Sequence, residues 1–466
     1  MANSGRGLTS ILTKMATRFS WGLADQGMSS LSNAFVSFYI ARELGASKFG
    51  AFSLAYVTYS FALNASRGLA TDPLLVRFSH TDAGSWRRAV ANCTGTAVIT
   101  GLVAGALALV AAELLSGTIR LAFLALGITL PLLMLQDSWR YSFFAVGRGQ
   151  QAFLNDTIWT LSLLPALLIL RFTHHGGVFT FIIAWGLAAA VAALAGPFQA
   201  RVVPSPSGAV AWLSKHRDLG PRYLAENTSN AGASQLRTYG IGIIAGLAAV
   251  GYVQEAGLLM GPFLVVFMGI SAVTVPEAAR ILRRSPRYLL LYCLLVGFGL
   301  AVLAAAWGGA LVVALPRGLG NLLLGKAWEP TAHLVVPVTL GVMGACLTVG
   351  ATAGLHALGA ARRSLRAMAV ASLIYLGCGL LGALEGGALG TCQGVALATW
   401  IGAALWWRQL RVAMREHQVP ASLAIRPQRL ARPALRPAYA AVSARSGQAS
   451  VAQAAVNGNG SIDRQS

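Results

Sequence analysis

Long apolar stretches recur along almost the entire chain, and each is long enough to cross a lipid bilayer. A transmembrane helix needs roughly 20 predominantly apolar residues to cover about 30 Å of hydrocarbon. Twelve stretches meet this requirement: 20–42, 48–66, 89–113, 119–145, 152–171, 178–200, 222–245, 249–275, 287–315, 330–355, 363–385 and 387–409. The eighth contains Pro262 and is followed by Pro276, so it could be broken. The sequence predicts an all-α membrane protein of about 12 transmembrane helices.

Composition excludes a sizeable soluble domain. Only 11% of the residues are charged and 56% are apolar, whereas a soluble domain carries about 25% charged residues. All five cysteines lie within apolar stretches and show no CxxC spacing, so we expect small core residues without metal or disulfides. The basic N-terminus leads into an apolar run that is too long for a cleavable signal peptide.

Lysine and arginine residues alternate between the two sides of the expected membrane. With the N-terminus in the cytoplasm, 29 of the 36 basic residues fall on the inner side and six on the outer side, and Arg237 lies inside a span. This asymmetry is the positive-inside pattern of membrane proteins. It places both termini in the cytoplasm, and it explains the net charge of +21 without a nucleic-acid partner.

The longest connections divide the chain into two halves of six helices. We expect a cytoplasmic N-terminal arm at 1–19, an N-terminal six-helix bundle at 20–200, a cytoplasmic linker at 201–221, a C-terminal six-helix bundle at 222–409 and a basic, disordered cytoplasmic tail at 410–466. The linker contains Trp212 and several basic residues, and we expect it to form an interfacial turn on anionic headgroups.

The two halves match each other at an offset of 201 residues. This offset places Asp25-Gln26 on Glu226-Asn227 and Gly50 on Gly251 without a gap. Because each half has an even number of helices, the halves would share one topology and be related by a pseudo-two-fold axis along the membrane normal.

Polar side chains form one stripe on the first helix and another on the seventh. The first consists of Asp25, Ser29, Ser32 and Asn33, and the second of Glu226, Asn230, Ser234 and Arg237. Ionisable residues within spans are costly and mark functional sites by default. We therefore expect both stripes to line one shared cavity, although the serine and asparagine residues could instead only join helices by hydrogen bonds.

Arg237 is the most informative of these residues. It lies 15 residues after Arg222, or roughly 22 Å along a helix, which is past the middle of the bilayer. A buried cation without a counter-charge is costly, so Arg237 implies a hydrated cavity, a carboxylate such as Glu255, or an anionic substrate. Near the inner end of the fourth helix, Asp137 and Arg140 are spaced for a local ion pair.

Several short motifs resemble those of a known family. They are Arg42-Glu43-Leu44-Gly45 with Phe49-Gly50-Ala51-Phe52, Asp137-Ser138-Trp139-Arg140-Tyr141 with Ala145-Val146-Gly147-Arg148, Gly261-Pro262 with Pro276-Glu277-Ala278-Ala279-Arg280, and Leu323-Leu324-Gly325-Lys326-Ala327-Trp328. In order and spacing the set resembles the Wzx-type polysaccharide (lipid-linked oligosaccharide) flippases of the multidrug/oligosaccharidyl-lipid/polysaccharide exporter superfamily. The resemblance implies two six-helix bundles around a central cavity, in a bacterial inner membrane.

The resemblance also implies a function and partners. The expected function is flipping of a lipid-linked glycan to the outer leaflet by alternating access, with Arg237 holding the anionic headgroup. Arg140 and Arg148 could draw anions to the inner mouth. The expected partners are the lipid-linked glycan, the bilayer and glycan-assembly enzymes.

Two other functions remain open. An exporter of drugs coupled to H+ or Na+ would use Asp25 or Glu226 as the coupling acid. A membrane glycosyltransferase or polymerase would need catalytic carboxylates on sizeable outer loops, whereas the outer loops expected here are short and their acids are scattered. Because no phosphate-binding glycine loop, DxD pair or HExxH motif is present, we expect neither an enzyme nor a cofactor.

The expected topology can be tested by labelling. Single cysteines placed in 67–88 or 201–221, in a cysteine-free background, should resist an impermeant thiol reagent in intact cells. Cysteines at 43–47 should react, since that loop is expected outside. Labelling of 201–221 from outside would contradict both the helix count and the two-half organisation.

Overall fold

The computed structural model describes residues 35–78, 81–173, 176–284 and 286–418, and every regular element in these ranges is helical. Most of the expected first helix, 20–42, lies outside the described residues, and residues 35–44 form its helical end. Residues up to Ala413 belong to one compact unit.

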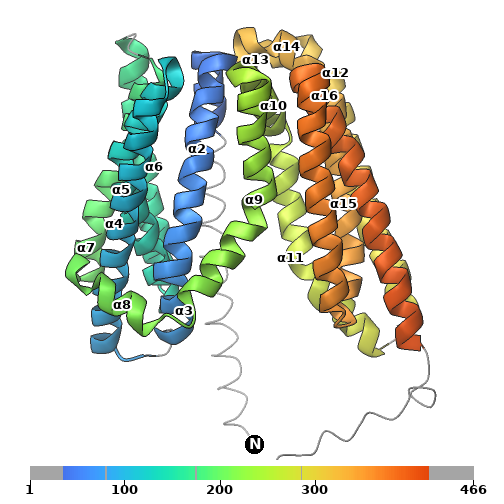
Figure 1. Ribbon diagram of the computed structural model, residues 1–466, viewed down its shortest axis with the longest axis horizontal. Coiled ribbons are helices and arrows are strands. Elements are labelled where there is room, and N and C mark those ends of the chain that lie inside the picture. The colour runs from blue at the N-terminus through green and yellow to red at the C-terminus, as the bar shows by residue number, and fades with distance from the viewer. Residues whose placement is uncertain (1–34, 79–80, 174–175, 285, 419–466) are drawn as a thin grey trace, which may run out of the picture. The chain divides into compact units, whose positions relative to one another are not determined.

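The helices of the N-terminal half follow one another through short connections (Figure 1). They are α2 (Ala46–Ser66), the π-helix η1 (Arg67–Thr71), α3 (Asp72–Phe78), α4 (Ala83–Leu114), α5 (Gly117–Ala145), α6 (Gly149–Phe172) and α7 (Val178–Ala200). The linker then forms η2 (Pro206–Gly208) and α8 (Ala209–Lys215).

The C-terminal half contains longer helices and a group of short ones. They are α9 (Gly220–Ile244), α10 (Gly246–Leu259), α11 (Gly261–Arg284), η3 (Pro286–Tyr288), α12 (Leu289–Ala314), η4 (Leu315–Arg317), α13 (Leu319–Leu324), η5 (Gly325–Ala327), α14 (Trp328–Ala332), α15 (Val335–Ala357) and α16 (Ala361–Gln418).

The structure is an all-α membrane protein, as the sequence predicts. Eight helices of the described residues are long and apolar enough to cross a membrane, and they are α4, α5, α6, α7, α11, α12, α15 and α16. The spans expected at 48–66 and 222–245 correspond to α2 and α9, which carry more polar residues.

The expected span 249–275 is divided into α10 and α11 at Met260. Proline has no N–H to donate and is tolerated in the first turn of a helix, where no internal bond is required. Pro262 takes the second position of α11, so a new helix starts where the old one would lose a hydrogen bond. Pro276 lies inside α11 without ending it.

The last two expected spans form a helical hairpin within α16. The backbone leaves helical geometry at Gly386 and Gly387, and Gly387 has a φ of 55°, which glycine adopts without steric cost. Gly382 and Gly390 pack against each other's carbonyl oxygens across the hairpin. The second arm extends to Gln418, beyond residue 409, where the sequence suggests that the tail begins.

The linker packs on the N-terminal half through Trp212. The Trp212 side chain is 3% exposed, and its Nε1 donates to the Leu69 carbonyl at 3.2 Å. Its ring stacks on Phe78 with 5.8 Å between the centroids. Trp212 therefore fixes the linker on the N-terminal half, and contact of the linker with headgroups stays a prediction.

The two halves meet through a reciprocal glycine contact between α2 and α10, which lie side by side (Figure 1). A Cβ at Gly50 would collide with the carbonyl oxygen of Leu247, and a Cβ at Gly251 with that of Ala46. Both pairs are related by the same offset of 201 residues that aligns the halves. Such reciprocity is expected at a two-fold interface, and it agrees with the pseudo-two-fold axis.

Replacing Gly50 by alanine should destabilise the protein by about 1–3 kcal/mol, because the added methyl group overpacks a backbone contact. Gly299→Ala is the matched control, since nothing lies within 4 Å of a Cβ at that helical position and alanine is the better helix former by up to ~1 kcal/mol. Thermal unfolding in detergent measures both changes. Equal melting temperatures for the two variants would contradict the close approach.

Candidate functional site

Arg237 lies near the C-terminal end of α9, and its side chain packs against helices of the C-terminal half. Its side chain is buried, at 9% exposure, and its guanidinium carbon lies 4.9 Å from the centre of the Tyr375 ring. A Cβ at Gly379 would come within 2.9 Å of the Arg237 Cδ. The missing side chain at Gly379 therefore makes room for the arginine stem beside α16.

A cavity of about 220 Å³ adjoins Arg237. It is lined by residues of α9, α10, α15 and α16, namely Arg237, Val253, Gln254, Gly257, Val338, Gly341, Val342, Ala345, Tyr375, Cys392, Val395 and Thr399. All of them belong to the C-terminal half. The sequence predicts one cavity shared between the halves, whereas this cavity lies inside one of them.

The charge of Arg237 is not neutralised by the cavity lining, which contains no acidic residue. Arg237 forms no ion pair within the described part of the chain, and its Nε is buried without a hydrogen-bond partner. The ion pair with Glu255 considered above is not formed. Glu255 is fully buried elsewhere, where it accepts a hydrogen bond of 2.8 Å from the Thr331 hydroxyl.

α9 contacts both halves at neighbouring residues. Positions 237 and 239 point to opposite sides of a helix, roughly 200° apart. The Tyr239 hydroxyl lies 2.6 Å from the Thr58 hydroxyl of α2, and its ring stacks on Phe61 with 6.4 Å between centroids. One turn of α9 thus joins the Arg237 cavity to the N-terminal half.

The other residues of the two predicted stripes are described only in part. Asp25, Ser29, Ser32 and Asn33 lie outside the described residues, and for Glu226 and Asn230 only the backbone of α9 is described. Ser234 is exposed. The prediction that Asp25 and Glu226 occupy equivalent places in the two halves and face one shared cavity therefore stays a prediction.

A second buried charged cluster lies in the N-terminal half, and sequence reasoning missed its central cation. Arg67 donates to both carboxylate oxygens of Asp137, from Nε at 2.9 Å and from an Nη at 2.7 Å. The guanidinium also lies 4.7 Å from the centre of the Tyr141 ring. Arg67 was assigned to a cytoplasmic loop, but the helix continues from α2 through the π-turn η1 into α3, and π-turns often mark functional sites.

Asp137 and Arg140 form the local ion pair that their spacing predicts, and Arg140 also pairs with a second carboxylate. They are 3.8 Å apart, while Arg140 Nε lies 2.9 Å from an oxygen of Asp156. Gln136 donates to that same oxygen at 3.0 Å. Two arginines and two aspartates, Arg67 included, therefore form one network in which the charges cancel.

The two arginines that were expected at an inner mouth have different surroundings. Arg140 is held inside the network, with 13% of its side chain exposed. Arg148 is exposed and lies 5.3 Å from the centre of the Trp86 ring. Whether they draw anions to an inner mouth stays a prediction.

Replacing Asp137 by asparagine should destabilise the folded protein by about 3–5 kcal/mol, because Arg67 would keep a buried charge without its carboxylate. The control is Glu113→Gln, which breaks an exposed pair with Arg120 and should cost less than about 1 kcal/mol. Melting temperature and yield of folded protein in detergent measure both. Equal losses in the two variants would show that the network is not a buried, coupled unit.

Solved structures of membrane transporters share the fold of this chain, although comparisons of its sequence find no relative. The sequence matches no family model and no curated protein. An inward-facing multidrug resistance MATE family transporter of the MOP superfamily matches with a TM-score of 0.61 at 15% identity, over 83% of this chain and 94% of that one. The lipid II flippase MurJ, in an inward closed conformation, matches with a TM-score of 0.63 at 12% identity, over 85% and 89%.

A MOP superfamily transporter from Pyrococcus furiosus also matches, with a TM-score of 0.51 at 14% identity, over 84% of this chain and 93% of that one. At these identities the shared property is the fold. The matches extend over 83–85% of this chain and 89–94% of the other chains. The chain therefore shares the fold of these membrane transporters.

Proposed function

We propose that this protein flips a lipid-linked oligosaccharide or polysaccharide precursor from the cytoplasmic to the outer leaflet by alternating access. The observation that carries the proposal is the Arg237 guanidinium, which is buried beside a cavity without an acidic lining residue. An ionised group in a membrane interior needs a counter-charge. We infer that the substrate's phosphate supplies it.

The surroundings of Arg237 suit a phosphate. The planar fork of arginine can donate two parallel hydrogen bonds to phosphate oxygens. Tyr375 contacts one side of the guanidinium, which limits its rotation and leaves its N–H edges for a ligand, and Gln254 and Thr399 add polar groups to the lining. A cavity of about 220 Å³ holds a phosphate and its link to a sugar, but the rest of the glycan would lie outside it.

The contacts between the halves suit alternating access. Gly50 and Gly251 join α2 and α10 at the ends that the charge distribution assigns to the outer side. The inward-facing MATE structure superposes with a TM-score of 0.61 and an outward-facing one with 0.51. We infer that the described conformation is closer to the inward-facing state, and that the glycine contact opens when the protein turns outward.

The second candidate is an ion-coupled exporter of drugs or other small molecules. Its support is the MATE neighbour and the apolar character of the Arg237 cavity, whose lining includes four valines. Asp25 and Glu226 are the acids expected to couple transport to H+ or Na+. Depletion separates the two candidates, because a flippase should cause a lipid-linked intermediate to accumulate and an exporter should cause sensitivity to its substrates.

Arg237 variants test the proposed role in complementation of a depletion strain. Arg237→Lys keeps the charge without the fork and should reduce function. Arg237→Gln should lower it at least tenfold, since a hydrogen bond to a charged group contributes about 1.5–3 kcal/mol. Arg171→Gln, which changes an exposed arginine, is the control and should complement fully. Membrane levels are measured alongside.

Protein levels distinguish binding from a structural role. Loss of function at normal levels supports phosphate binding by Arg237. Loss of the protein itself would assign Arg237 a structural role. Neutralising Glu255 as well should not restore the protein level, because Glu255 is hydrogen-bonded to Thr331 and not paired with Arg237. Full function of Arg237→Ala at normal levels would contradict the proposal.

A further inference from the structure

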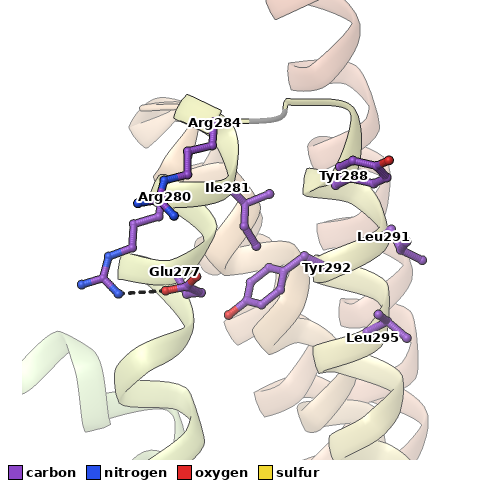
Figure 2. Close-up of a pocket in the computed structure, with 8 residues that line it drawn as sticks. All are labelled: Glu277, Arg280, Ile281, Arg284, Tyr288, Leu291, Tyr292 and Leu295. Carbon is purple, nitrogen blue, oxygen red and sulfur yellow. Dashed lines mark hydrogen bonds and ion pairs between the residues drawn. The ribbon is translucent and has the colours of Figure 1, made fainter.

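A groove between the inner ends of α11 and α12 is separate from the Arg237 cavity and shares no lining residue with it. Its volume is about 410 Å³, within the roughly 300–1,000 Å³ typical of small-ligand sites. Figure 2 shows Tyr292 projecting from α12 toward Glu277 and Ile281 of α11, while Arg280 and Arg284 extend from the other side of α11. The charge distribution assigns this end of both helices to the cytoplasmic side.

Helical spacing gives the groove two different walls. On α11, Glu277, Arg280 and Arg284 follow each other at three and four residues, so they share one face. On the opposite side, Tyr288 is followed at the same spacing by Leu291 and Leu295. One wall is therefore charged, and the other runs from an aromatic ring to aliphatic side chains.

The charged wall carries a surplus of positive charge. Glu277 accepts a hydrogen bond of 2.9 Å from Arg280, but these side chains are 45% and 64% exposed, and such exposed pairs are weak. Arg284 has no ion-pair partner in the described residues. Arg287 adds a cation at the rim, 4.8 Å from the centre of the Tyr288 ring.

The other wall continues toward the hydrocarbon region. Leu291 and Leu295 are 51% and 64% exposed, which is favourable only against lipid tails. Tyr292 bridges the two helices, because its hydroxyl donates to the Thr274 carbonyl at 3.3 Å. Tyrosine side chains are enriched at the level of the headgroups, so the groove has a cationic mouth at the interface and an apolar side below it.

We propose that this groove binds an anionic phospholipid of the inner leaflet. The phosphate contacts Arg280 and Arg284, the Tyr288 ring packs on the glycerol region, and one acyl chain follows Leu291 and Leu295. Basic pockets between transmembrane helices on the cytoplasmic side are typical sites for anionic headgroups. The site is independent of the proposed transport function, because it can be measured without any transported substrate.

The test is lipid retention by the purified full-length protein. The protein is stripped of lipid in a neutral detergent, mixed with equal amounts of dioleoyl phosphatidylglycerol and dioleoyl phosphatidylcholine, and analysed by native mass spectrometry. The wild type should retain phosphatidylglycerol preferentially. Arg284→Gln should weaken the binding of phosphatidylglycerol about fivefold, since one arginine near a membrane surface contributes about 1 kcal/mol. The double variant Arg280→Gln/Arg284→Gln should weaken that binding further.

The matched control is Arg362→Gln/Arg366→Gln, which removes two exposed arginines of the same spacing from the start of α16 and should leave retention within about twofold of wild type. Leu295→Asn should weaken the binding of both lipids, because it removes part of the apolar wall. The proposal is overturned if the groove variants retain phosphatidylglycerol like wild type, or if the control loses as much. Displacement by excess inorganic phosphate would also overturn it, since that result identifies a free-anion site.

Discussion

The hydrocarbon interior of a bilayer cannot solvate charge, so every ionised side chain in a span needs a partner, water or a substrate. The two halves of this protein meet that requirement differently although they share one fold. In the N-terminal half, Arg67 and Arg140 are neutralised by Asp137 and Asp156. In the C-terminal half, Arg237 lies beside the Tyr375 ring and a cavity whose lining contains no acidic residue.

This asymmetry suggests a division of roles between the halves. A neutral network, in which Arg67 makes a bidentate pair with Asp137, joins η1, α5 and α6. Its two positive and two negative charges cancel. In the C-terminal cavity, no acidic lining residue neutralises the Arg237 guanidinium, so its charge can bind an anionic ligand. α9 connects the two, since Tyr239 contacts Thr58 while Arg237 faces the cavity. A ligand that binds Arg237 would therefore contact the helix that joins the two halves. Such a contact would couple ligand binding to the relative position of the halves, as alternating access requires.

Much of the fold could be predicted from sequence, because apolar length and charge distribution are properties of the chain itself. The offset of 201 residues aligns Gly50 with Gly251, and the structure gives a physical reason for glycine at both positions. Each lies against the backbone of the other helix in one reciprocal contact. The site was harder to predict. Arg67 was missed because an arginine after an apolar run suggests a helix end, whereas its carboxylate partner on α5 lets the helix continue. Likewise, the polar stripe on α9 does not show that the adjoining cavity lies within one half. That position depends on packing against α16, where Gly379 leaves room for the Arg237 side chain.

The most direct measurement of the central claim is flipping by the purified protein in liposomes that contain a fluorescent polyprenyl-pyrophosphate-linked disaccharide. An impermeant glycosidase added outside cleaves only sugars exposed in the outer leaflet. With the wild-type protein the sugars of the inner leaflet should also become accessible, whereas with Arg237→Gln, reconstituted at the same level, cleavage should stop at the lipid already outside. Equal cleavage with wild-type protein and with empty liposomes would contradict the account.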